Sequence, residues 1–281
     1  MVAAEANGYR ASVTIAPGKL DGAPTQPGMD LAARIDLGQG ERKTNELYDA
    51  IPHRHTNRFP FDVRKPVPSD FLETLSRAAS DEPEVKLFLF TADPNRKRVV
   101  HIIGQSVDEI LHFYPGMFKA NAKWFRDWNE AQKTRDGITV DDVGQPPLAT
   151  ALLKFLPRSM DKMMSPLLIK ILYVDLMMTG RLHGAIAVRG RYEQSQNVSA
   201  GRIWQRAHLL ATAYGLAARP VNQAAELVDQ EGLHDKEPKA AATLATVTGD
   251  AVWQPTFMFY MGYATHQAHP TVRRSVQDVV I

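Results

Sequence analysis

A short apolar segment, VKLFLFTAD (Val85–Asp93), constrains the fold of this chain more than any other feature. Its apolar residues would face both sides of a strand, and they include the β-branched and aromatic types that favour strands. This pattern is typical of a central strand that is buried on both faces. An amphipathic helix is predicted directly before it, over Pro68–Ser80, because the apolar residues there recur at helical spacing.

The rest of the chain mixes strands with longer helices. Further strands are predicted over Ala11–Ala16, Leu31–Leu37 and Trp253–Ala264, and further helices over Asn45–Ile51, Asn95–Glu130 and Ser199–Gly215. The second of these helices is interrupted at Pro115-Gly116, and Ser199 and Gly215 can cap and end the third. Residues 228–250 form a charged, Ala/Thr-rich connection. The mixture predicts an α+β domain with one sheet core, without the βαβ rhythm and Gly-rich turn of a Rossmann unit.

From Asp136 to Gly190 the pattern is irregular and rich in methionine. Methionine fills adaptable apolar surfaces, so this stretch is interpreted either as a mobile lid over a pocket or as an insertion packed on the body. The methionines concerned are Met160, Met163, Met164, Met177 and Met178.

Composition excludes several function classes. None of the 281 residues is cysteine, which removes disulfides, thiolate metal sites and cysteine nucleophiles and favours the reducing cytoplasm. A net charge of +2 gives no global field for nucleic acid. The longest apolar stretch, Pro166–Met178, is too short to span a bilayer, and the start of the chain does not resemble a signal peptide. We therefore expect a soluble, cytoplasmic protein without nucleic-acid or membrane partners.

The densest polar cluster is PHRHTNRF, residues 52–59. An extended backbone would place Arg54, Thr56 and Arg58 on one side, where two guanidiniums and a hydroxyl suit a phosphate. A solvated basic loop is the other interpretation of the same residues. His53 and His55 lack a third ligand at metal-binding spacing, so no metal site is expected. A second basic pair, Arg273 and Arg274, lies in the C-terminal tail.

Three segments in this order resemble nitroreductase-family proteins. LYDAIPHRHTNRFPFD (Leu47–Asp62) resembles the opening helix and Arg-x-Ser/Thr-x-Arg/Lys segment, and GRIWQRAHLLATAYGLAARPVNQ (Gly201–Gln223) resembles the long central helix with its Pro-containing loop. QPTFMFYMGYATHQAHPTVRRSVQDVV (Gln254–Val280) resembles the final strand and basic tail. The resemblance implies a nitroreductase-like fold, with an antiparallel or mixed central sheet flanked by helices and a helical lid insertion.

The resemblance is closest to the Acg-like branch, in which one chain carries two degenerate halves. Residues 1–40 look like the remnant of a first half, residues 41–281 like the FMN-binding domain, and residues from about 130 to 195 like the lid insertion. The flavin-contacting segment that this branch carries near its start, Pro-Ser-x-x-Asn-x-Gln-Pro-Trp, does not occur here. An incomplete first half favours a homodimer. Trp204 and His208, which lie off the apolar stripe of their helix, are expected to face a partner subunit or the other half.

The resemblance also implies a flavin site. Arg54, His55, Thr56 and Arg58 would hold the FMN phosphate and ribityl chain, and Arg273 or Arg274 would close over the phosphate. Pro220, Val221 and Asn222 match the loop beside the isoalloxazine ring, where a backbone N–H donates to N5. The implied function is an FMN-dependent oxidoreductase that passes hydride equivalents from NAD(P)H to a small-molecule acceptor such as a nitroaromatic or quinone. The alternative is a protein that binds FMN under a lid without turnover.

Overall fold

A computed structural model describes residues 1–20, 31–145, 150–151 and 174–280. Its main sheet has four antiparallel strands in the order β3 (Val85–Phe90), β4 (Leu182–Val188), β6 (Gln254–Gly262) and β5 (Ala217–Pro220). A separate two-stranded antiparallel sheet consists of β1 (Tyr9–Ile15) and β2 (Ala33–Gln39). The expected strands near both ends of the chain are therefore present, with boundaries shifted by a few residues.

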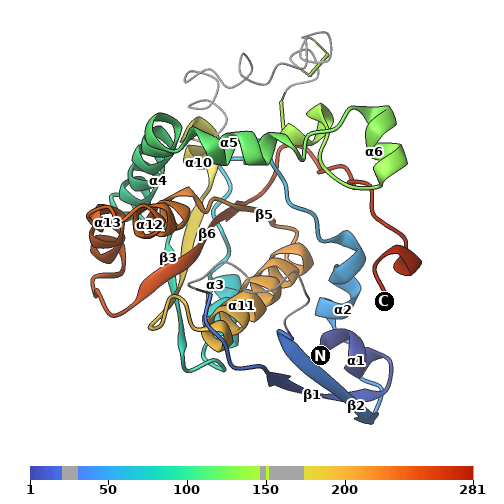
Figure 1. Ribbon diagram of the computed structural model, residues 1–281. Helices are drawn as coiled ribbons and strands as arrows, with labels where there is room; N and C mark the ends of the chain where they lie inside the picture. Colours follow the sequence, from blue (N-terminus) through green and yellow to red (C-terminus); the bar gives the residue numbers. More distant parts are fainter. Residues whose placement is uncertain (21–30, 146–149, 152–173, 281) are drawn as a thin grey trace.

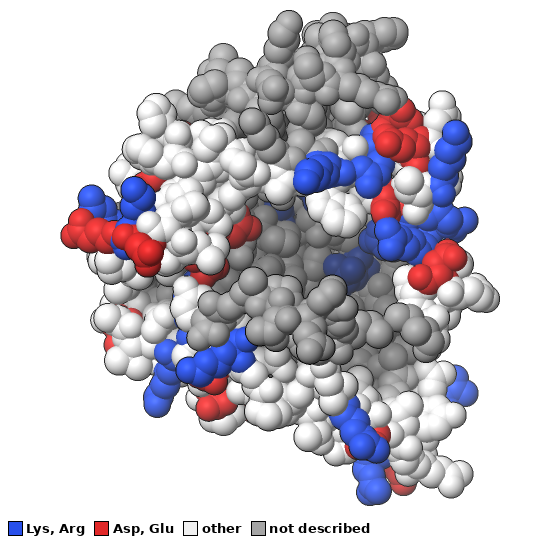
Figure 2. All heavy atoms as spheres, viewed as in Figure 1, with Lys and Arg blue, Asp and Glu red and all other residues white. Residues whose placement is uncertain are grey.

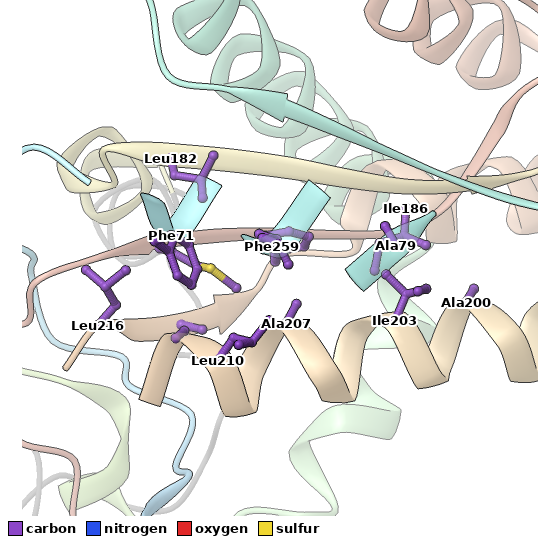
Figure 3. Packing of buried hydrophobic residues seen from close by; sticks show 14 of the residues in the cluster. Phe71, Ala79, Leu182, Ile186, Ala200, Ile203, Ala207, Leu210, Leu216 and Phe259 are labelled. Carbon is purple, nitrogen blue, oxygen red and sulfur yellow. The ribbon is translucent and has the colours of Figure 1, made fainter. Parts of the chain in front are cut away.

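Helices cover both faces of the four-stranded sheet (Figure 1). On one face, α3 (Ser69–Ala79) and α11 (Gln194–Ala213) pack against β4 and β6 through a cluster that includes Phe71, Ile203 and Phe259, drawn in Figure 3. On the other face, α4 (Asn95–Phe113), α12 (Gln223–Leu233) and α13 (Lys239–Thr248) bury Ile103, Leu244 and the apolar residues around them. The expected α+β core is confirmed.

The central strand of the core is β4, so the prediction for Val85–Asp93 was wrong in part. That segment does form a strand, β3, but it lies at the edge of the sheet and most of its side chains are half-buried. All seven residues of β4 are buried. The sequence LHGAIAV carries a histidine, a glycine and two alanines, and therefore lacks the bulky apolar run by which a buried strand is recognised. Small residues are accommodated because large side chains such as Phe259 pack over them.

Two further expectations need correction. Residues 228–250 are mostly helical, in α12 and α13, because alanine-rich sequence has high helix propensity and Pro238 separates the two helices. Helix α11 begins at Gln194, so Ser199 lies inside it as a buried residue and is not its cap. Its end is as expected: Gly215, two residues beyond Ala213, adopts a φ of +69°.

The insertion expected over about 130–195 cannot extend that far, since β4 belongs to the core sheet. Met177 is buried in the core as well, whereas Met160, Met163 and Met164 lie outside the described residues. The part before residue 146 consists of α6 (Trp128–Thr134) and a 3-10 helix over Val140–Val143. The assignment of residues 1–40 to a first half stays a prediction.

Short elements complete the chain. These are the helices α1 (Val2–Ala6), α2 (Glu46–Ala50) and α10 (Leu176–Thr179), together with 3-10 helices over Ile51–His53 and Val276–Asp278. The expected break at Pro115 is confirmed, because α4 ends at Phe113 and α5 (Pro115–Ala122) follows. Of the helices in the described ranges, none combines the length and the apolar character that crossing a bilayer demands.

Candidate functional site: a cationic cluster beside strand β5

The arginine segment after α2 lies along the outer edge of β5. Thr56 forms a parallel bridge with Ala218, and the Asn57 N–H donates to the Ala218 carbonyl at 3.1 Å. The buried Asn57 side chain fixes the segment further, because its Oδ1 accepts from the Phe59 N–H at 2.9 Å and its Nδ2 donates to the His266 carbonyl at 2.8 Å. Arg54, His55 and Arg58 are half-buried in consequence. The interpretation as a solvated loop is therefore wrong.

Arg54 is held by a histidine of the central helix. Its Nη1 lies 3.2 Å from Nδ1 of His208, whose Nε2 lies 3.2 Å from the His55 carbonyl oxygen. A guanidinium only donates and a carbonyl only accepts, so Nδ1 accepts and Nε2–H donates. The arrangement thus selects the neutral Nε2–H form of His208. Burial, followed by the charge of Arg54, lowers the pKa of His208 to about 4, so this form prevails at neutral pH.

The C-terminal tail brings a second arginine to the same place. Burial and then the charge of Arg273 lower the pKa of Arg54. Burial also lowers the pKa of His55, and the charges of Arg54, Arg273 and His53 lower it further. Within the described ranges, neither Arg54 nor Arg273 forms an ion pair with a carboxylate. Arg54, His55 and Arg273 form what we call the cationic cluster, and it fits a dianionic phosphate.

Two other expected phosphate ligands, Arg58 and Arg274, have partners of their own. Arg58 Nη1 donates to the Asp142 carbonyl at 3.4 Å, and the Arg58 carbonyl accepts from Arg219. Arg274 is bound to Asp136 at 2.5 Å, and Arg126 also pairs with this carboxylate. The charge of Arg273 therefore acts on Arg54, whereas that of Arg274 is paired with Asp136. In Figure 2, basic and acidic side chains are gathered over α6 and the tail, in keeping with these pairs.

The loop that follows β5 offers one backbone donor. Pro220 has no N–H, and the Val221 N–H donates to the Met258 carbonyl at 2.9 Å. Asn222 stands at the N-cap position of α12, but its Oδ1 accepts from the Met258 N–H at 3.1 Å, which fixes the loop to β6. The Asn222 N–H has no acceptor in the part of the chain that the structure describes. Thr56 pairs with Ala218 of β5, and Asn222 follows the end of this strand at Pro220.

A cleft lies between the insertion and the tail. It consists of adjoining cavities of about 600 and 510 Å³ that share Asp141 and His269. The larger reaches Val272, the residue before Arg273, and the smaller reaches Phe59, the residue after Arg58. Cavities of this size suit a small organic molecule. Among the residues that the structure describes, no three potential metal ligands lie together.

Several residues of this site were not predicted as part of it. Trp204 and His208 face inward, which corrects the expectation that they face a partner or another half. Trp204 packs on Phe257 and Phe259 of β6, and His208 is 2% exposed. Asn57 and Arg219 carry no sequence signal for their roles either, because their partners are distant in the chain.

Comparison with solved structures identifies the fold. The FMN-dependent nitroreductase NfnB from Mycobacterium smegmatis, solved in complex with NADPH, superposes with a TM-score of 0.54 at 13% identity, covering 84% of this chain and 97% of that one. The FMN and NADPH-dependent nitroreductase NfnB from Sphigopyxis sp. strain HMH gives 0.53 at 14% identity, with 84% and 97% covered. The sequence matches no protein-family model and no curated protein. The chain thus has the nitroreductase-like fold.

Proposed function

We propose that this chain binds FMN and acts as an oxidoreductase, with NAD(P)H as the reductant and a nitroaromatic, quinone or similar small molecule as the acceptor. The observation that carries the proposal is the cationic cluster, in which the charge of Arg273 acts on half-buried Arg54 and neither arginine pairs with a carboxylate of the described residues. Burial and the charge of the exposed Arg273 both disfavour the charged form of half-buried Arg54, so a bound dianion would stabilise its guanidinium. The nitroreductases of the same fold are FMN-dependent by their own descriptions.

Each residue of the site has a distinct part in this proposal. Arg54 and Arg273 would bind the phosphate, with the Thr56 hydroxyl as a neutral donor and His55 contributing its backbone or ring. The Asn222 N–H would donate to N5, since Pro220 and Val221 have no donor to offer. Arg58 and Arg219 would stabilise the loop that carries Arg54, because Arg219 donates to the Arg58 carbonyl.

When bound, FMN would supply the redox chemistry by accepting a hydride from the nicotinamide and passing reducing equivalents to the acceptor. The residues of the chain would bind and orient the reactants. Positive charge in the site would stabilise negative charge on a bound flavin, and the cleft between insertion and tail would give the nicotinamide and the acceptor one place to bind in turn. This role needs no side-chain acid or base. We also propose that residues 1–40 derive from a first half, as in the Acg-like branch, since β1 and β2 form a sheet of their own.

An absorbance spectrum followed by rapid mixing tests the function. The protein is mixed with excess FMN and desalted, and NADPH is added anaerobically while absorbance is followed between 300 and 550 nm. We expect flavin bands that co-elute with the protein and that NADPH bleaches. Retained flavin that NADPH does not bleach would support the non-catalytic alternative instead. Protein that stays colourless would contradict both functions.

A further inference from the structure

Strand β2 is an edge strand with an exposed surface. It pairs with β1 on one side, and no other described strand pairs with its second side. Six of its seven residues, Arg34–Gln39, are exposed. Figure 1 shows β2 at the outer end of the molecule, away from the four-stranded sheet. An open strand edge presents unpaired N–H and C=O groups to any strand that approaches it.

One face of this small sheet is apolar. Directly paired residues share a face, and the pairs Val13–Ile35 and Ala11–Leu37 place four apolar side chains together. The β1 members are half-buried, whereas Ile35 is 61% and Leu37 58% exposed. Arg34 and Asp36 lie on the opposite face, where they form an exposed ion pair at 3.0 Å. Figure 2 shows basic and acidic side chains next to each other over this end of the molecule.

We propose that β2 pairs with β2 of a second copy of this chain, antiparallel and across a twofold axis at Ile35. The two hairpins then form one four-stranded sheet with a continuous apolar face. A twofold axis makes the interface self-complementary, so that one surface serves both copies.

Charge fixes this register. With the axis at Ile35, Arg34 lies opposite the partner subunit's Asp36, and Asp36 lies opposite the partner subunit's Arg34. An axis at Arg34 or at Asp36 would set like charges directly opposite each other, which is unfavourable. A shift by a single residue would turn the apolar residues of one strand towards the charged face of the other. The alternation Arg34-Ile35-Asp36 is therefore self-complementary in one antiparallel register, and this selects a second copy over an unrelated strand.

Charge reversal provides the test, with sedimentation velocity over a range of protein concentrations as the readout. Wild type is expected to show a concentration-dependent monomer–dimer equilibrium. Arg34→Asp and Asp36→Arg each place like charges opposite at two symmetric positions, and each should raise the dimer dissociation constant by about tenfold or more. The double variant R34D/D36R restores both opposite-charge pairs and should dimerise like wild type.

Mixing gives the sharpest outcome. R34D carries two acidic residues on β2 and D36R two basic residues, so an equimolar mixture of these variants should form heterodimers although each alone is mostly monomeric. Arg64→Asp is the matched control, because Arg64 is also exposed and paired with an aspartate two residues away but lies outside β2. A monomeric wild type at every concentration would overturn the proposal. So would single variants that dimerise as well as wild type. Neither readout involves flavin, so the outcome is independent of the proposed function.

Discussion

Arg54 and His208 are 154 residues apart in the sequence, yet Nη1 of the arginine lies 3.2 Å from Nδ1 of the histidine. The histidine belongs to the central helix α11 and the arginine to the loop along β5, so this bond couples the site to the core. A neutral acceptor orients the guanidinium without cancelling its charge, as a carboxylate would. The full charge of Arg54 therefore remains available to an anion.

Substitutions of His208 should show how much each of its two hydrogen bonds contributes to FMN binding. His208→Leu removes both, and we expect FMN affinity to fall by about tenfold or more, the usual cost of an orienting bond to a charged group. His208→Asn can retain an acceptor for Arg54, and His208→Gln a donor for the His55 carbonyl. In isothermal titration calorimetry, the affinity for FMN should therefore be highest for wild type and His208→Asn, lower for His208→Gln and lowest for His208→Leu.

Nuclear magnetic resonance of the imidazole tests the same relationship without a ligand. The nitrogen shifts of His208 should report a protonated Nε2 and a bare Nδ1 at pH 7. The opposite tautomer, or equal FMN affinity across all three variants, would remove the positioning role of His208.

The stability of the protein should decrease as the pH falls below about 6.5. Burial lowers the pKa of His208 to about 4 and that of His183 to about 3. Between these values and 6.5 the unfolded chain binds protons that the folded chain does not, so this contribution is complete above about pH 6.5 and is lost as the pH falls towards the folded pKa values. Burial raises the pKa values of Glu226 and Glu231, so the contribution of these two groups to stability increases as the pH falls.

Urea unfolding at pH 7, 6, 5 and 4.5 measures this dependence. In His208→Leu the free energy of unfolding should depend less on pH. The loss of stability between pH 7 and pH 4.5 should be smaller than in wild type by an amount on the order of 2 to 3 kcal/mol. A variant with the same slope as wild type would show that burial does not lower the pKa of His208 in the folded protein.

Gly184 should tolerate no side chain. A Cβ at this position of the central strand would lie 2.2 Å from the Phe259 ring, which is itself buried against Trp204. Gly184→Val should therefore lower the free energy of unfolding by about 3 kcal/mol or abolish folding, as overpacking does. Gly201 on α11 is the control, because a Cβ added there would meet no atom within 4 Å. Gly201→Ala should raise stability by about 0.5 to 1 kcal/mol, and chemical denaturation compares the two.

The sequence allowed the class of fold and the long helices α3, α4 and α11 to be predicted, since their apolar positions recur at a clear period. Phe71 and Leu75 on α3 are examples, and both are buried in the core. Strand β4 could not be recognised, because Gly184 and Ala185 have no pattern of their own and are explained only by the large side chains of β6 that cover them. Similarly, nothing in Val85–Phe90 indicates that a second strand would take the central place.

For the site, the arginines were recognisable and their partners were not. Arg54 and Arg58 belong to a local motif, and Arg273 and Arg274 to a visible basic pair. Which arginine of the pair reaches Arg54 depends on Asp136, which binds Arg274 from the insertion. The role of His208 depends on a contact between a helix and a distant loop. Local sequence carries no information on either contact.

The most direct test of the central claim is an FMN titration, followed by flavin fluorescence, of wild type, Arg54→Ala, Arg273→Ala and Arg274→Ala. The cationic cluster predicts that wild type binds FMN and that loss of Arg54 or Arg273 weakens binding by about 10- to 100-fold, since each would donate charged hydrogen bonds to the phosphate. Arg274→Ala should bind nearly as wild type does, because Asp136 holds that side chain. FMN binding that is unchanged in Arg54→Ala and Arg273→Ala would contradict the account, as would a wild type that binds no FMN.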